Sequence, residues 1–160
     1  PLGRGPDGKP LLLADGHDLA FNLSHSAEVV LVALCARGPV GVDVEVLDAA
    51  PPDPDVLAAA WFHGAEADDL RRVAAAARPA RFLALWTRKE AYGKARGDGL
   101  ASSIAPGPRV DPGLARQRLV GPDGRAWLCL DLALPVRAVG AVVVPDVASH
   151  PASRGSEDRP

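Results

Sequence analysis

The residues best suited to chemistry lie in one stretch, Trp86-Thr87-Arg88-Lys89-Glu90-Ala91-Tyr92-Gly93-Lys94. Glu90 falls one helical turn after Trp86 and one turn before Lys94, so the three residues would share one side of a helix. A carboxylate between two ammonium groups suits the binding of phosphate, because lysine is a compact point charge. The ordinary alternative is a helix end with one Glu–Lys pair and a lysine that extends its amine to solvent.

The use of lysine favours the functional interpretation. The chain has 18 basic residues, and only Lys9, Lys89 and Lys94 are lysines. A chain that otherwise uses arginine therefore keeps lysine twice beside Glu90, although arginine is not a neutral replacement at a phosphate site. Lys9 lies in a glycine- and proline-rich loop, where a solvated side chain is the ordinary interpretation.

Two more carboxylates lie close together in the segment 40–46, whose valines alternate as in a strand. Asp43 and Glu45 are two residues apart and share one face of that strand, and Gly41 on the same face leaves space beside Asp43. A solvated acidic face is a common arrangement. Adjacent carboxylates repel unless a cation neutralises them, however, and Mg²⁺ is typically held by one or two carboxylates plus substrate phosphates.

A third cluster, Ser24-His25-Ser26, ends an alternating segment in which Leu19, Phe21 and Leu23 would form the buried face of a strand. The serines could satisfy local backbone groups in a turn, or the cluster could bind an anion; the residues alone leave both open. Asp43, Glu45 and Glu90 could converge on one Mg²⁺. Phosphates would then be bound by the basic residues Lys89 and Lys94 beside the metal, and by Lys9 and His25 farther away.

These residues must be positioned by a mixture of helices and strands. The patterns predict helices at 56–61, 65–77 and 79–96, the last of which begins at Pro79 and ends at Gly97 or Gly99. They predict strands at 19–24, 28–36, 40–46, 117–120, 126–132 and 137–144, with a short turn that makes the first two a hairpin, and the apolar segment 28–36 fully buried. Strands, then helices, then strands indicate an α+β fold.

Composition excludes several classes of protein. The net charge of −2 and the absence of a basic run argue against nucleic-acid binding. We expect no membrane association and a cytoplasmic location, because no signal peptide and no apolar run long enough for a bilayer are present. Cys35 and Cys129 have no metal-ligand spacing and are expected to be buried thiols.

Four motifs occur in a defined order: Gly8-Lys9-Pro10, Phe21-Asn22-Leu23-Ser24-His25-Ser26, Gly41-Val42-Asp43-Val44-Glu45, and Trp86-x-x-Lys89-Glu90-Ala91-x-x-Lys94-x-x-Gly97-x-Gly99-Leu100. This set resembles the 4'-phosphopantetheinyl transferases of the type that activates surfactin synthetase. The resemblance runs from about Lys9 to Val144, and its last motif is long and highly specific. The smaller, trimeric holo-acyl-carrier-protein synthases share the last two motifs but lack a Ser-His-Ser strand before them.

The resemblance implies two similar α/β halves with coenzyme A bound between them. It implies that Mg²⁺ is held by Asp43, Glu45 and Glu90, that Lys9, Ser24 and His25 contact the 3'-phosphoadenosine end, and that Lys89 and Lys94 contact phosphates. A serine of an acyl or peptidyl carrier protein, from fatty-acid, polyketide or nonribosomal peptide synthesis, would attack the phosphate that bears pantetheine, and 3',5'-ADP would leave. Glu90 and Lys94 would be the catalytic residues.

The chain departs from the family pattern at its beginning. Only seven residues precede Gly8-Lys9-Pro10, where the family has most of a first half. We therefore expect residues 1–38 to be a remnant of the first half, residues 39–145 the Mg²⁺-binding half, and residues 146–160 a disordered tail. The full-length form is expected to be a monomer. The alternative function is that of a non-catalytic remnant that binds carrier proteins.

Overall fold

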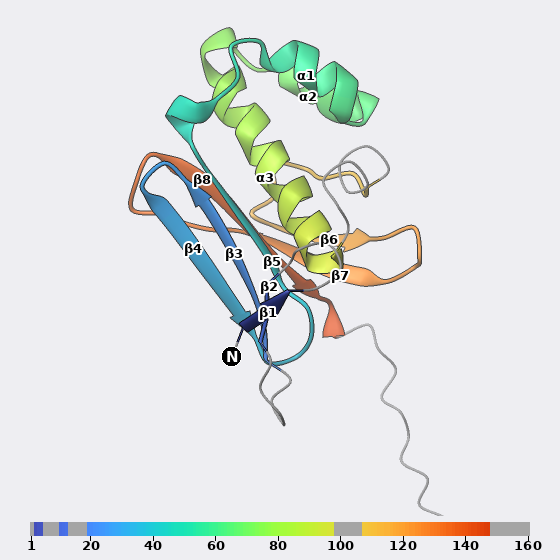
Figure 1. The fold of residues 1–160 in the computed structure, drawn as a ribbon. Helices are drawn as coiled ribbons and strands as arrows, with labels where there is room; N and C mark the ends of the chain where they lie inside the picture. The colour runs from blue at the N-terminus through green and yellow to red at the C-terminus, as the bar shows by residue number, and fades with distance from the viewer. Residues whose placement is uncertain (1, 5–9, 13–18, 98–106, 148–160) are drawn as a thin grey trace, which may run out of the picture.

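One long helix lies across one face of a four-stranded antiparallel sheet (Figure 1). The strand order is β5-β8-β7-β6, with strands β5 (Gly41–Val46), β6 (Arg116–Val120), β7 (Ala126–Asp131) and β8 (Ala138–Pro145). The helix is α3 (Arg78–Arg96). The structure is a computed structural model that describes residues 2–4, 10–12, 19–97 and 107–147. This combination of helices and antiparallel strands confirms the predicted α+β class.

Helix α3 begins and ends as its sequence predicts. Pro79 lies in its first turn, where a missing backbone N–H leaves no hydrogen bond unmade. Gly97 ends the helix with a left-handed φ of 81°, and its N–H donates to the Gly93 carbonyl at 3.0 Å. Glycine adopts this conformation without the strain that a Cβ would cause, which is why the helix stops there.

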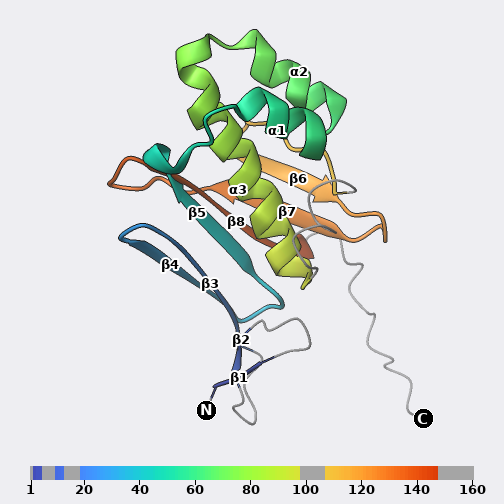
Figure 2. The same cartoon turned by 45° about the horizontal axis from the view of Figure 1, so that its top comes forward.

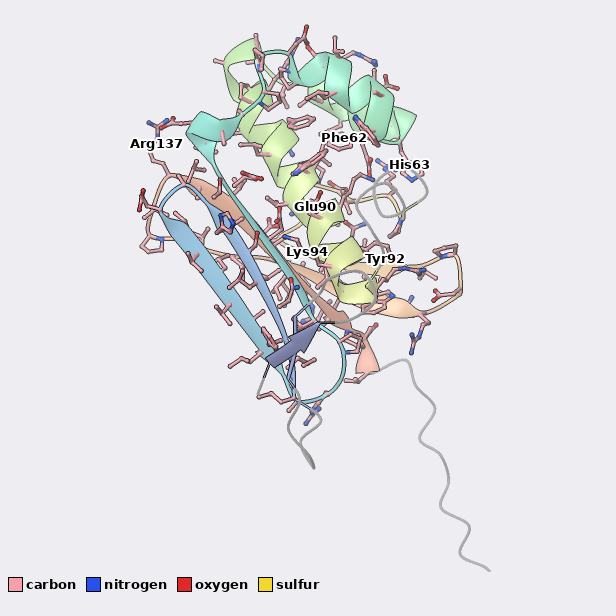
Figure 3. All side chains as sticks on the ribbon, viewed as in Figure 1. Phe62, His63, Glu90, Tyr92, Lys94 and Arg137 are labelled. Atoms are coloured by element: carbon pink, nitrogen blue, oxygen red, sulfur yellow. The ribbon has the colours of Figure 1, made fainter. Side chains whose placement is uncertain are left out.

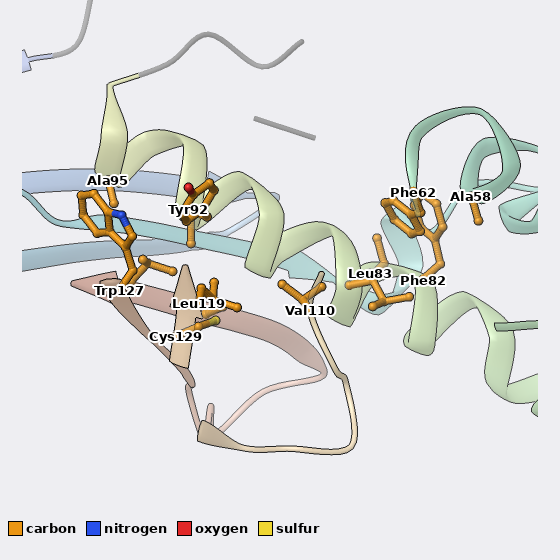
Figure 4. Close-up of a cluster of buried hydrophobic side chains, with 14 of the residues drawn as sticks. Ala58, Phe62, Phe82, Leu83, Tyr92, Ala95, Val110, Leu119, Trp127 and Cys129 are labelled. Carbon is orange, nitrogen blue, oxygen red and sulfur yellow. The ribbon is translucent and has the colours of Figure 1, made fainter. Parts of the chain in front are cut away.

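The apolar core fills the layer between α3 and the sheet (Figure 4). The helix contributes Ala91, Tyr92 and Ala95, and the sheet contributes Trp127 and Cys129 among others. The Tyr92 ring meets the Trp127 ring edge-on, with 6.0 Å between centroids. Each fully buried apolar side chain of this size stabilises the fold by about 1.5–3 kcal/mol, so the last turns of α3 are held firmly on the sheet.

Two short helices, α1 (Pro54–Trp61) and α2 (Gly64–Arg72), pack near the N-terminal part of α3 (Figure 2). The Phe62 ring between them stacks on Phe82 of α3 at 5.1 Å, and Phe82 stacks on Trp86 at 5.8 Å. Trp86 is therefore a packing residue, partly buried against the apolar core.

The second predicted helix, 65–77, is shorter than expected. Helix α2 ends at Arg72, because Val73 has extended torsion angles (φ −82°, ψ 155°), and residues 75–77 form only a 3₁₀ turn. The Arg78 guanidinium donates to the Arg71 carbonyl at 3.2 Å and to the Val73 carbonyl at 3.3 Å. Arg78 thus satisfies carbonyls that a continued helix would have used.

The hairpin of β3 (Ala20–Ser26) and β4 (Val29–Cys35) lies beside β5 and forms a separate two-stranded sheet (Figures 1 and 2). The hairpin itself confirms the prediction. The predicted burial is wrong, because the polar side chains of β3 face β5 and are buried, whereas Leu23 is 45% exposed. Strand β4 is not fully buried either. None of the described residues covers the other face of the hairpin, which exposes Leu23, Val30, Val32 and Leu34; we call these four residues the outer face.

The chain ends are described only in part. A short pair of strands, β1 (Leu2–Arg4) and β2 (Pro10–Leu12), precedes the hairpin. The predicted tail begins later than residue 146, because the Asp146 N–H donates to the Ala126 carbonyl at 3.0 Å and its carboxylate pairs with Arg118 at 2.9 Å. Residues 148–160 of the expected disordered tail lie outside the described residues. No described helix has the length and apolar character needed to cross a bilayer.

Candidate active site

A close backbone contact joins β5 to α3. The space that the sequence predicts beside Gly41 is filled by the helix, since a Cβ at this position would overlap the Ala91 carbonyl oxygen and the Ala95 nitrogen. Any larger residue would force the strand and the helix apart. Asp43, on the same face of β5 as Gly41, is therefore held directly against the last turns of α3.

Three side chains from three elements meet at this contact: Ser24 of β3, Asp43 of β5 and Lys94 of α3. The Lys94 ammonium lies 2.6 Å from Asp43 Oδ1 and 3.1 Å from Ser24 Oγ, and Ser24 Oγ donates to Asp43 Oδ1 at 2.8 Å. Lys94 also donates to the Val42 carbonyl at 3.3 Å. Asp43 is almost fully buried, whereas 29% of the Lys94 side chain is exposed. The ion pair is therefore buried at the acid and partly exposed along the Lys94 side chain.

One carboxylate oxygen of Asp43 has no described hydrogen-bond partner. Its Oδ2 atom is buried and accepts no hydrogen bond from any described residue. A buried carboxylate oxygen without a partner is costly and is a natural position for a cation. Within the described part of the chain, however, no three His, Cys, Asp or Glu side chains are grouped so that they could hold a metal ion. The convergence of Asp43, Glu45 and Glu90 on Mg²⁺ therefore stays a prediction.

Glu90 lies on α3 one turn before Lys94 (Figure 3). The pKa of Glu90 is raised to about 7, mainly by burial and then by the carboxylates of Asp43 and Glu45, while Lys94 lowers it. The two carboxylates of β5 thus act on Glu90 across the β5–α3 contact.

Lys89 lies apart from this group, paired with Glu66, and its contact with phosphate stays a prediction. Its side chain is 1% exposed, and its ammonium lies 2.9 Å from Glu66 of α2 and over the Phe62 ring at 5.6 Å. Burial lowers the pKa of Lys89, and Glu66 opposes this effect. Adjacent residues of a helix point about 100° apart, so Lys89 and Glu90 cannot serve the same surface.

His25 also lies apart from the Ser24–Asp43–Lys94 group. Successive residues of a strand point to opposite faces, so the buried Ser24 places His25 on the exposed face of β3. The two hydroxyls of Ser24 and Ser26 are on one side, and His25 is on the other. Lys9, the remaining predicted contact to 3'-phosphoadenosine, lies outside the described residues.

The partners of the buried charges were not predicted from the sequence. Glu66 forms an ion pair with Lys89 and accepts hydrogen bonds from the His63 N–H at 3.0 Å and from the Val110 N–H at 2.7 Å. An acid at the third position of a helix is a capping signal, and this signal could have identified Glu66.

A second buried cation, Arg88, is 1% exposed. Its guanidinium forms a two-pronged pair with Asp131 at 2.8 and 2.6 Å and donates to the carbonyls of Leu114 and Asp111. No sequence signal distinguishes this arginine from the exposed ones. Arg88 and Lys89 thus tie α3 to its neighbours, while Glu90 and Lys94 face the site.

Comparison with known proteins identifies the same region. Residues 39–114 match the model of the 4'-phosphopantetheinyl transferase superfamily. The 4'-phosphopantetheinyl transferase HetI of Nostoc sp. is 34% identical over 140 residues, which are 86% of this chain and 57% of HetI. The 4'-phosphopantetheinyl transferase AcpT of Salmonella typhi is 40% identical over 94 residues, which are 58% of this chain and 47% of AcpT.

A third relative, the 4'-phosphopantetheinyl transferase gsp of Aneurinibacillus migulanus, is 38% identical over 94 residues, which are 58% of this chain and 36% of gsp. The chain spans about half the length of the curated relatives it matches. The matched segment 39–114 contains β5 and α3, the two elements that supply Asp43, Glu90 and Lys94. Within this segment, the chain is similar to the 4'-phosphopantetheinyl transferase superfamily.

Proposed function

We propose that this chain acts in the transfer of 4'-phosphopantetheine from coenzyme A to a serine hydroxyl of an acyl or peptidyl carrier protein. The observation that carries the proposal is the contact of Ser24, Asp43 and Lys94, with Glu90 one turn away. These residues come from three separate motifs, and they meet at one point of the fold. The names of the relatives supply the reaction type.

Asp43, Glu45 and Glu90 would hold Mg²⁺. Two features of the residues fit a divalent cation: the unpartnered buried oxygen of Asp43, and the raised pKa of Glu90 beside two other carboxylates. A cation relieves both, because it supplies a ligand to the oxygen and removes the repulsion. When bound, Mg²⁺ would neutralise charge on the pyrophosphate of coenzyme A.

Side chains of the protein would position the phosphate and accept the proton. Lys94, whose side chain is partly exposed, would present its charge to a phosphate, and Ser24 would hold Asp43 and Lys94 in place. Glu90, with a pKa of about 7, would accept the proton of the attacking serine at physiological pH. The serine oxygen would bond to the phosphorus that bears pantetheine while the P–O bond of the pyrophosphate breaks, and 3',5'-ADP would leave. Lys9 and His25 are retained as proposed contacts to 3'-phosphoadenosine.

Mass spectrometry of carrier proteins incubated with the chain, coenzyme A and Mg²⁺ tests this function. We expect a gain of one phosphopantetheine on the carrier serine, and no gain with Glu90→Gln. Carriers from fatty-acid, polyketide and nonribosomal peptide synthesis should all be tried. Folded protein that modifies none of them would contradict the proposal. A carrier that binds stably without gaining mass would favour the alternative, a non-catalytic carrier-binding protein.

A further inference from the structure

The edge of β5 that faces the hairpin has an unusual partner. Strand β5 pairs with the backbone of β8 on one side only. On the other side its amides donate to side chains of β3. The Val42 N–H donates to Asn22 Oδ1 at 2.8 Å, the Val44 N–H to Ser24 Oγ at 3.4 Å, and the Val46 N–H to Ser26 Oγ at 3.1 Å. We call Asn22, Ser24 and Ser26 the polar ladder; it replaces the carbonyls that a neighbouring strand would offer.

The serines of the polar ladder also donate hydrogen bonds to the carboxylates of β5. Ser24 Oγ donates to Asp43 at 2.8 Å, and Ser26 Oγ donates to Glu45 Oε2 at 2.7 Å. A hydroxyl has one proton and two acceptor sites, so each serine can hold a carboxylate and the following backbone N–H at the same time. Beside Asn22, the residue of β5 that corresponds to Asp43 and Glu45 is Gly41, which has no side chain. Asn22 Oδ1 therefore only accepts from the Val42 N–H.

Burial gives these hydrogen bonds their weight. Asn22, Ser24 and Ser26 are 5%, 6% and 8% exposed, so water cannot readily replace a lost partner. Leaving a buried acceptor or donor without a hydrogen bond costs more free energy than a typical hydrogen bond contributes to stability. The direction in which Asp43 and Glu45 point is therefore set by a strand other than their own.

We propose that Ser26 is a positioning residue for Glu45, and that the polar ladder as a whole fixes both β5 carboxylates for the site at α3. The consequence for catalysis rests on the proposed transferase function. The positioning itself rests only on the contacts between β3 and β5, so the two can be tested separately. Ser26 is the best probe, because Ser24 also contacts Lys94.

The test uses the full 160-residue chain with Ser26→Ala and with the matched pair Ser26→Thr and Ser26→Val. Threonine and valine have the same shape and differ in the hydroxyl, and both suit a strand. Leu23→Ala, on the outer face of the same strand, is the control. The first readout is hydrogen exchange of the Val46 amide. The second is Mn²⁺ binding by electron paramagnetic resonance, and the third is the Mg²⁺ concentration that half-saturates transfer.

With Ser26→Ala and Ser26→Val we expect the Val46 amide to exchange about tenfold faster, because one hydrogen bond is lost. We also expect Mn²⁺ affinity to fall about tenfold or more, the usual scale for removing a residue that orients a metal ligand. Half-saturating Mg²⁺ should rise by the same factor with the KM for coenzyme A unchanged, and Ser26→Thr should behave like the wild type.

Equal behaviour of Ser26→Thr and Ser26→Val would overturn the proposal, because the hydroxyl would then be irrelevant. Equal effects of Ser26→Ala and Leu23→Ala would also overturn it, because the strand would merely be weakened. If the wild-type chain modifies no carrier, the transferase function fails, while the exchange of the Val46 amide and Mn²⁺ binding still decide the positioning role.

Discussion

Two lysines of one helix pair with two acids in opposite ways. Lys89 and Glu66 are 1% and 0% exposed, with 2.9 Å between the charged atoms. Lys94 and Asp43 are 29% and 6% exposed, with 2.6 Å between them. The first pair is closed to solvent, and Glu66 also accepts from backbone N–H groups of two other segments. The second pair is open, because part of the Lys94 side chain is exposed, and Asp43 Oδ2 has no described hydrogen-bond partner.

The difference separates a structural charge pair from one that can do chemistry. A closed pair is shut off from water, so a ligand in solution cannot reach it. An open pair beside further carboxylates stays within reach of a phosphate or a cation. Lys89 and Lys94 lie only five positions apart on α3, but their partners come from different elements, α2 and β5.

The largest effect is expected from breaking the closed pair. Lys89→Met should lower the free energy of unfolding by about 3–5 kcal/mol, because Glu66 would be left buried without its counter-charge. Urea unfolding followed by circular dichroism measures this. The double variant Lys89→Met, Glu66→Gln should recover most of the loss. A Lys89→Met protein as stable as the wild type would show that the buried pair does not stabilise the fold.

Breaking the open pair should reduce activity rather than folding. Lys94→Ala should slow phosphopantetheine transfer about 10²-fold, the scale for losing one preorganised electrostatic contact. The free energy of unfolding should change less than for Lys89→Met, because the Lys94 side chain is partly exposed. Rates from mass spectrometry at saturating coenzyme A, compared with the unfolding of the same preparations, measure both. The idea fails if Lys94→Ala keeps its rate.

The acid of the open pair is expected to behave differently from an exposed carboxylate. Asp43 is buried and accepts from Lys94 and Ser24. Asp43→Ala should abolish transfer and also lower the free energy of unfolding by about 1–3 kcal/mol, because the donors lose their acceptor. Thermal unfolding beside transfer assays separates the two effects.

The smallest effect concerns Glu90 and pH. Its pKa is raised from 4.5 to about 7, so the folded state keeps the proton at pH values where the unfolded state has lost it. The associated stability is fully present below pH 4.5 and is lost as pH rises through about 7. Between pH 5 and 8, without divalent cations, the wild type should lose about 1–2 kcal/mol relative to Glu90→Gln, after allowance for solvent screening.

Added Mg²⁺ should reduce this pH-dependent difference, because a cation favours the ionised carboxylate. Urea titrations of the two proteins at each pH provide the measurement, and groups common to both cancel. A constant difference from pH 5 to 8 would mean that neither burial nor the neighbouring carboxylates raise the pKa of Glu90.

Local sequence signals predicted the helix and the strand that carry the candidate site. Pro79 and Gly97 marked α3, because proline and glycine act through backbone geometry alone. The alternation of valines placed Asp43 and Glu45 on one strand face, and the strand does carry them toward the site. What the sequence could not give was the partner of each charge. The pairs Lys89–Glu66 and Arg88–Asp131 join residues 23 and 43 positions apart, and no local pattern connects them.

The burial of β3 was predicted with the wrong face for an instructive reason. Apolar periodicity assigns Leu23 to the interior, since a strand usually turns its apolar face toward the core. Here the strand turns its Asn and Ser side chains inward to serve the open edge of β5. Polar residues at every second position of an apolar strand were the available signal, and they indicate a strand whose polar side has a partner.

The outer face also has a consequence for how copies of this chain interact in solution. Leu23, Val30, Val32 and Leu34 present apolar atoms on neighbouring strands, and their exposed fractions run from 45% to 66%. Such a surface makes the force between two approaching molecules attractive. The osmotic second virial coefficient, measured by static light scattering, should therefore be negative and should fall further with added sulfate, which strengthens apolar association. Val32→Lys should shift the second virial coefficient toward positive values, since a charge on a strand surface opposes contact.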